Sequence, residues 1–163
     1  NYLENYAIVG KHPVFGEGWH YLRLRLNYFL YTKDENVIYS AYYMRNLFSV
    51  PVSNEIFMHQ AKAQWSSTRL SWHDRVDSDN IISKIDNSDK KYCSFEITDF
   101  VQKCVNDPSW ETESIGVLLK GEDNAYHILS TSDNTMYSPY IKLVLSKMPR
   151  KFEPKDNINE PLF

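Results

Sequence analysis

Hydrophobic and polar residues alternate along several short stretches of the chain, and the clearest of these is 21–27. There, leucines at every second position face one side of an extended backbone, and the arginines between them face the other. This pattern predicts a half-buried strand. Similar stretches rich in tyrosine and β-branched residues predict strands over 38–50, 55–65, 68–72, 81–85, 92–97, 115–120, 126–130 and 140–145.

The predicted strands are short, and Asp, Asn, Ser, Gly or Pro separates each from the next. About nine or ten such strands without helical periodicity between them favour an antiparallel fold over a parallel α/β arrangement. We therefore expect an all-β fold, namely an antiparallel two-sheet β-sandwich with jelly-roll-like topology.

One segment departs from the strand pattern and predicts a single short helix. Thr98 and Asp99 can cap a helix in which Phe100, Val101, Cys104 and Val105 fall on one side. Asn106, Asp107 and Pro108 then end it.

The length of 163 residues, 42% of them hydrophobic, suits one domain with one core. We place this domain at 1–146. The residues after it, 147–163, are rich in proline and charge and predict a linker or C-terminal tail. We expect a monomer within a larger multidomain protein.

The charge balance argues against a nucleic-acid partner. The chain has 18 Lys and Arg residues against 21 Asp and Glu residues, and it contains no run of basic residues. No apolar stretch is long enough to cross a bilayer, so we expect no membrane insertion. Aromatic residues make up 15% of the chain, and such rings favour pleated sheets and contact surfaces.

The sequence carries no common catalytic motif. A nucleophile elbow, a His-Glu-x-x-His pair and glycine-rich phosphate loops are all missing, and no pair of carboxylates stands out among the acidic residues. We therefore expect a protein that is not an enzyme. A polysaccharide lyase is the catalytic alternative, because it needs only a Tyr or His base beside an Arg.

Neither the cysteines nor the histidines predict a metal site. Cys93 and Cys104 match no zinc spacing and are interpreted as buried thiols, with a disulfide as the alternative. The five histidines are scattered. We expect no cofactor, and the sequence assigns no residue as a metal ligand. Asp74, Asp77 and Asp79 form a candidate loop for a structural calcium ion, with a solvated loop as the alternative.

Arginines and tyrosines supply the candidate ligand-binding residues. Tyr21, Arg23 and Arg25 share the polar side of the first predicted strand, and Tyr42 and Met44 are placed on the outward side of the next. Guanidinium groups beside aromatic rings suit an acidic or hydroxyl-rich sugar. The alternative is an ordinary solvated sheet face.

Four tryptophans could either fill the core or form stacking platforms. Trp65 and Trp72 adjoin predicted strands and are interpreted as structural, whereas Trp19 and Trp110 lie beside turn residues, where either could touch a ligand.

Six sequence blocks between residues 20 and 146 give the chain a family resemblance. The strongest are the Trp65 to Trp72 block and the Phe-x-Ile-Thr-Asp entry to the predicted helix. The blocks are 22–26, 40–41, 65–72, 95–102, 116–120 and 138–141. In this order they resemble DNRLRE domains, bacterial extracellular β-sandwich modules grouped with carbohydrate-binding module family 96 and similar in outline to the propeptide of transforming growth factor β precursors.

The resemblance implies a jelly-roll-like module, secreted or attached to the cell surface, that binds alginate-like acidic polysaccharide and has no catalytic role. Two positions depart from the family pattern. Cys104 stands where the family usually has tryptophan, and Arg45 stands where it usually has an apolar residue. If Tyr43 and Leu47 face the core, Arg45 points inwards and needs a polar partner or lines a pocket.

These observations lead to a non-catalytic extracellular carbohydrate-binding module as the first hypothesis. It would target a polysaccharide or glycan for an attached enzyme or surface protein. We assign carbohydrate binding to Tyr21, Arg23, Arg25, Tyr42 and Arg45. The alternative hypothesis is a structural or adhesion module of a bacterial surface protein.

Overall fold

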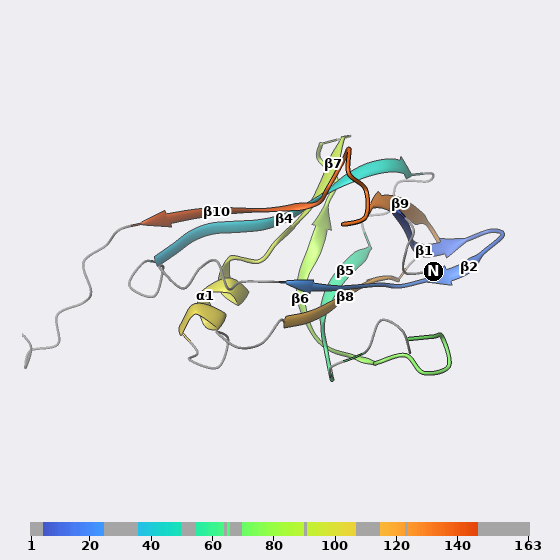
Figure 1. The fold of residues 1–163 in the computed structure, drawn as a ribbon, viewed down its shortest axis with the longest axis horizontal. Helices are drawn as coiled ribbons and strands as arrows, with labels where there is room; N and C mark the ends of the chain where they lie inside the picture. The colour runs from blue at the N-terminus through green and yellow to red at the C-terminus, as the bar shows by residue number, and fades with distance from the viewer. Residues whose placement is uncertain are drawn as a thin grey trace, which may run out of the picture.

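The structure is a computed structural model that describes residues 5–24, 36–49, 55–63, 65, 70–89, 91–106, 115–122 and 124–146 (Figure 1). Strands make up most of this part of the chain. The elements in chain order are β1 (Tyr6–His12), β2 (Gly16–Gly18), β3 (His20–Leu24), β4 (Asn36–Ser49), β5 (Ile56–Ala61), β6 (Ser78–Asp86), β7 (Tyr92–Glu96), α1 (Thr98–Asn106), β8 (Ile115–Gly121), β9 (Tyr126–Ser130) and β10 (Tyr140–Ser146).

Hydrogen bonds join the strands into one continuous path. Its order is β2-β1-β9-β4-β7-β6-β5-β8-β3, and β10 pairs with β4 beside it. Each of the strand pairs is antiparallel. β1 lies against β8 and β3, so the path nearly closes on itself. The antiparallel β fold with one short helix is thus confirmed, while the division into two jelly-roll sheets stays a prediction.

Two glycines allow the backbones to approach at this near-closure. Gly10 has a φ of 108°, which L side chains rarely adopt, and a Cβ there would lie 2.2 Å from the carbonyl oxygen of Ala125. A Cβ on Gly121 would lie 2.8 Å from the Cα of Gly10. The missing side chain of Gly121 therefore lets β8 approach the backbone of β1, and that of Gly10 lets β1 approach the residue before β9.

The apolar core lies between the strands and under α1. Its buried members come from nearly every strand, as expected when antiparallel strands present alternate side chains to one interior. They include Val9, Leu24, Met44, Ile56, Met58, Ile85, Cys93, Phe95, Ile97, Val101, Val117, Leu119 and Leu129.

The structure corrects the predicted orientation of β4. Tyr42 pairs with Phe95 of β7 and Met44 pairs with Cys93, and these pairs face the core. The prediction that Tyr42 and Met44 point outwards is therefore wrong, and Arg45 lies on the side away from this core. β4 carries bulky residues at both odd and even positions, so alternation alone did not identify its buried side. Its pairing with β7 decides the side.

Helix α1 has the bounds that the sequence predicts. The hydroxyl of Thr98 accepts a hydrogen bond from the backbone N–H of Ser40 at 3.0 Å, which fastens the start of the helix to β4. Val101 is buried, and Phe100 and Cys104 pack against the core. Within the described residues, no helix has the length and apolar character needed to cross a bilayer.

Several predicted boundaries differ from the observed ones. β1 and β2 were not predicted, because neighbouring residues of β1 such as Val9 and Gly10 are both buried and break the alternation. Residues 70–72 form no strand, and the rest of the predicted strand 68–72 lies outside the described residues. The expected tail 147–163 also lies outside them, so the division at 146 stays a prediction.

Candidate ligand-binding surfaces

Four aromatic side chains from distant parts of the sequence meet beside β3. Tyr21 makes an edge contact with Trp65, with ring centroids 5.3 Å apart, and lies 6.5 Å from Trp19. Trp19 in turn meets Trp72 edge-on at 5.1 Å. We call these four residues, together with Arg23, Arg75 and Lys120, the tryptophan cluster.

Two cations lie over the indole rings at one end of the tryptophan cluster. The Nζ of Lys120 lies 4.1 Å from the ring centroid of Trp19. The guanidinium carbon of Arg75 lies 4.8 Å from the ring of Trp72 and 5.4 Å from that of Trp19. The negative face of an indole ring attracts a cation at such distances.

At the other end, Trp65 packs between a strand and an arginine. A Cβ on Gly116 of β8 would lie 2.1 Å from the Cζ3 of Trp65, so the ring occupies space that only a glycine leaves free. The guanidinium carbon of Arg23 lies 5.0 Å from the ring centroid, and Arg23 also donates a hydrogen bond to the Trp65 carbonyl oxygen. Trp65 is thus held in one place on the sheet.

Hydrogen bonds fasten the 70–77 segment to this surface. The hydroxyl of Tyr21 donates to the carbonyl oxygen of Val76, and burial raises the pKa of this phenol. Arg75 donates to the carbonyl oxygen of Trp72 at 2.6 Å, which closes a local turn. Because these contacts fix the segment, the exposed groups of the tryptophan cluster are held in place without a ligand.

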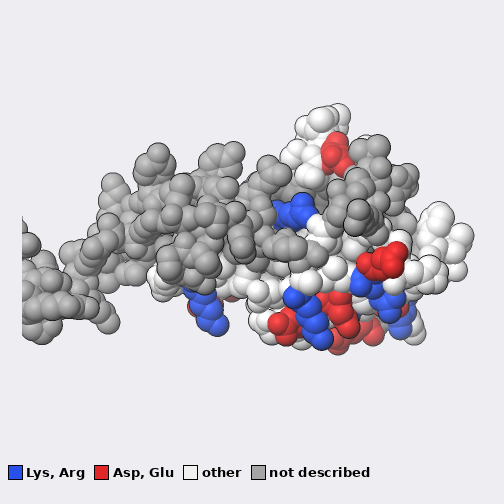
Figure 2. All heavy atoms as spheres, turned by 60° about the horizontal axis from the view of Figure 1, so that its bottom comes forward, with Lys and Arg blue, Asp and Glu red and all other residues white. Residues whose placement is uncertain are grey.

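The outer part of the tryptophan cluster is open to solvent. Trp72 is 46% exposed, and Arg23 and Arg75 are also exposed. Figure 2 shows the side of the molecule below β3 and β8 in Figure 1, where Lys and Arg are interspersed with Asp and Glu. An acidic ligand would therefore depend on individual cations rather than on a uniformly positive surface.

One carboxylate adjoins these cations. The backbone N–H of Ser78 donates to Asp77 at 2.9 Å and holds the pKa of this carboxyl below its usual range, with further lowering from Lys62, Lys120 and Arg75. Asp77 therefore stays charged and neutralises part of the local positive field.

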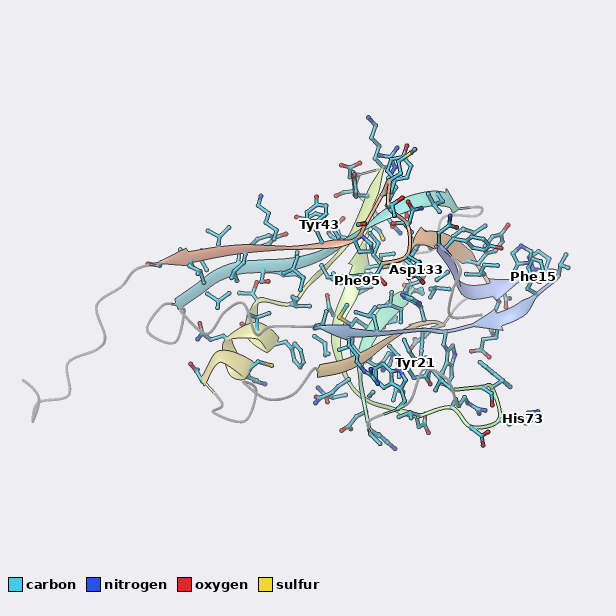
Figure 3. The ribbon with its side chains drawn as sticks, viewed as in Figure 1. Phe15, Tyr21, Tyr43, His73, Phe95 and Asp133 are labelled. Carbon is cyan, nitrogen blue, oxygen red and sulfur yellow. The ribbon has the colours of Figure 1, made fainter. Side chains whose placement is uncertain are left out.

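A second aromatic group lies on the outward side of β4 and β10. Tyr43 and Tyr140 stack with centroids 5.0 Å apart and planes inclined by 8°. Tyr92 meets Tyr140 edge-on at 6.0 Å, and Arg45 lies over the rings of Tyr92 and Tyr137. We call these five residues the tyrosine cluster. In Figure 3, Tyr43 lies in the upper part of the view, beside β4 and β10, and Tyr21 lies in the lower part.

The structure separates the predicted carbohydrate-binding residues. Tyr21 and Arg23 come together around Trp65, whereas Arg45, on β4, belongs to the tyrosine cluster. Tyr42 packs against the core, and burial raises the pKa of its phenol. Arg25 lies outside the described residues, as does Trp110.

Sequence reasoning did not identify most of the tryptophan cluster. Trp65 and Trp72 were interpreted as structural, and Arg75 and Lys120 were not singled out. The available signal was the pair of tryptophans flanking a polar segment that contains an arginine. Only the tertiary structure shows that Trp72 meets Trp19 and that Trp65 meets Tyr21.

No metal site appears in the part of the chain that the structure describes. There, no three His, Cys, Asp or Glu residues gather closely enough to hold an ion. Asp74, Asp77 and Asp79 do not form such a group. The oxygen of Asp74 lies near the hydroxyl of Ser71 at 3.4 Å, and Asp77 accepts from Ser78. The loop carries local hydrogen bonds of the kind found in ordinary turns.

Comparison with known proteins places the chain in no family. No protein-family model matches it, and no curated protein matches it either. The resemblance to DNRLRE domains therefore stays a prediction.

Proposed function

We propose that this chain is a non-catalytic extracellular carbohydrate-binding module that binds an acidic polysaccharide through the tryptophan cluster. In this proposal the strands divide into two sheets of a jelly-roll-like sandwich, and the ligand binds on an outer face. The module would bring an attached enzyme or surface protein to its polysaccharide.

The observation that carries the proposal is the arrangement around Trp72. Its exposed ring lies under Arg75 and against Trp19, which itself lies under Lys120. An exposed indole can stack on the C–H face of a pyranose ring, and a guanidinium group can bind a carboxylate with two parallel hydrogen bonds. A uronic acid residue offers both features in one sugar.

The fixed geometry of the cluster also supports binding. Arg75 and Trp72 are joined by a hydrogen bond, and Lys120 donates to Ser78 at 3.3 Å. Groups that are already ordered lose little conformational entropy when a ligand binds.

Affinity electrophoresis in gels with a polyuronate or with a neutral glucan tests the proposal. We expect retention in the polyuronate gel and about tenfold weaker affinity for Trp72→Ala and for Arg75→Ala. The matched control is Phe15→Ala, which removes an exposed ring at the tip of the β1–β2 turn and should leave retention unchanged (Figure 3). Retention should also weaken with added salt.

The outcomes separate the proposal from a structural or adhesion module. If no polysaccharide retains the protein, the carbohydrate-binding proposal is wrong. If a polyuronate retains the variants as it does the wild type but the variants unfold at lower temperature, the tryptophan cluster only fastens the 70–77 segment, and the assignment of the binding site to this cluster is wrong.

A further inference from the structure

We propose that the tyrosine cluster is a second site for an acidic sugar, so that one domain binds two polysaccharide chains and bridges them. The inference rests on the proposed function, because it assigns the same class of ligand to a second surface. It differs in its residues, which belong to β4, β7, β10 and the segment between β9 and β10.

Arg45 is the anion-binding group of this second site. Its guanidinium carbon lies 4.7 Å from the ring centroid of Tyr137 and 5.3 Å from that of Tyr92. The π face of a phenol ring attracts the guanidinium cation, but it accepts no hydrogen bond of the kind that a carboxylate oxygen accepts from the guanidinium N–H groups. Over the described ranges, no ion pair joins Arg45 to an acidic residue. The half-buried guanidinium group therefore keeps donors for an external carboxylate.

The surroundings of Arg45 are ordered without a ligand. Its backbone N–H donates to the hydroxyl of Ser130 at 3.1 Å. The side-chain oxygen of Asn134 accepts from the N–H of Tyr137 at 2.8 Å, and the carbonyl oxygen of Asn134 accepts from the hydroxyl of Ser138 at 2.7 Å. These bonds hold the ring of Tyr137 over Arg45, which reduces the entropy lost on binding.

A stacking surface adjoins the arginine. Tyr140 is 47% exposed, it stacks on Tyr43, and its edge contact with Tyr92 connects it to the ring beneath Arg45. A sugar whose carboxylate binds Arg45 can thus place its own ring, or that of the next sugar, against Tyr140.

The two clusters share one chemistry at two separate places on the fold. Each combines an arginine over aromatic rings with a partly exposed ring, and Tyr21 and Tyr43 mark their separate positions in Figure 3. Because one chain of sugars held on one surface leaves the other surface open, two sites on one domain would join two chains.

Isothermal titration of the whole chain with a short homo-uronate oligosaccharide tests the inference. We expect two oligosaccharides per domain for the wild type, one for Arg45→Ala, one for Arg75→Ala and none at the same concentrations for the double variant. Each lost site should weaken at least about tenfold. Lys103→Ala is the matched control because it removes an exposed cation of α1, which contributes to neither cluster, and should keep both sites.

Two further variants protect the test from a folding defect. Arg45→Lys keeps the charge but not the planar fork, and Tyr140→Ala removes an exposed ring, so both should fold and both should weaken the second site. Far-UV circular dichroism checks that they fold.

The outcomes distinguish this inference from the proposed function. If the wild type binds one oligosaccharide per domain, and this binding is lost in Arg75→Ala but unchanged in Arg45→Ala, the second site is wrong and the proposed function stands. If the wild type binds one oligosaccharide per domain and only Arg45→Ala loses it, the tyrosine cluster is supported as a site and the tryptophan cluster is wrong as a site. If a polyglutamate peptide binds the tyrosine cluster as tightly as the uronate does and Arg45→Ala abolishes this binding, the cluster is a general anion site and the assignment to a sugar is wrong. If no uronate binds at all, both the proposed function and the second site are wrong.

Discussion

The phenol rings of Tyr43 on β4 and Tyr140 on β10 stack almost in parallel, with their centroids 5.0 Å apart. These residues face each other directly in the β4–β10 register, which brings together side chains almost a hundred positions apart in the sequence. The stack therefore stabilises the strand pair and also forms part of the tyrosine cluster.

We predict that Tyr43→Ala and Tyr140→Ala are coupled in their effects on stability. A double-mutant cycle by urea unfolding should give a coupling of about 0.5–1.5 kcal/mol, the usual size for an aromatic pair. Tyr43→Ala combined with Met136→Ala, which removes an exposed side chain in the β9–β10 segment, should be additive. Additivity of the tyrosine pair as well would show that the stack contributes nothing of its own.

A side chain at Gly116 should displace Trp65. We expect Gly116→Ala to lower the free energy of unfolding by about 1–3 kcal/mol, because the new Cβ meets the indole ring at 2.1 Å, and to change the tryptophan fluorescence. Gly16→Ala is the control, since Gly16 has a φ of 78° but open space around it. It should cost only about 1 kcal/mol of backbone strain and leave the fluorescence as it was.

Stability should fall on the acid side because of His20. Burial lowers the pKa of His20 from 6.5 to about 4, so the unfolded chain takes up a proton at a pH where the folded protein does not. The contribution to stability is therefore fully present above about pH 6.5 and is lost as the pH falls towards 4, by on the order of 2–3 kcal/mol.

Urea unfolding at about pH 7.5 and about pH 4.5 measures this effect. His20→Gln should show a smaller loss between these values than the wild type, whereas His73→Gln, in the exposed 70–77 segment, should lose as much as the wild type. An unchanged loss in His20→Gln would assign the acid sensitivity to other groups.

The thiol of Cys93 should react slowly in the folded protein. Cys93 is a free, buried thiol, and burial raises its pKa to about 12. Because the thiolate is the reactive form, iodoacetamide should modify Cys93 in the folded Cys104→Ser variant at least about a hundredfold more slowly than in the same variant unfolded in urea. Mass spectrometry follows the reaction. Rapid modification of the folded variant would mean that this part of the core opens readily.

The sequence by itself determined the type and approximate place of most elements. Alternating leucines predicted β3, tyrosine-rich and branched stretches predicted most other strands, and the Thr98 cap with its apolar side predicted α1. These features depend on local backbone geometry and on burial of one side, which a short window of residues already contains.

The tertiary structure decided which side of β4 is buried and which side chains meet. β4 has bulky residues on both sides, so only its pairing with β7 places Tyr42 in the core and Arg45 outside it. The contact of Trp72 with Trp19 joins two segments that no repeating pattern of hydrophobic and polar residues connects. Such contacts arise from strand order and register, which the whole chain settles together, so no local pattern could have separated the two clusters.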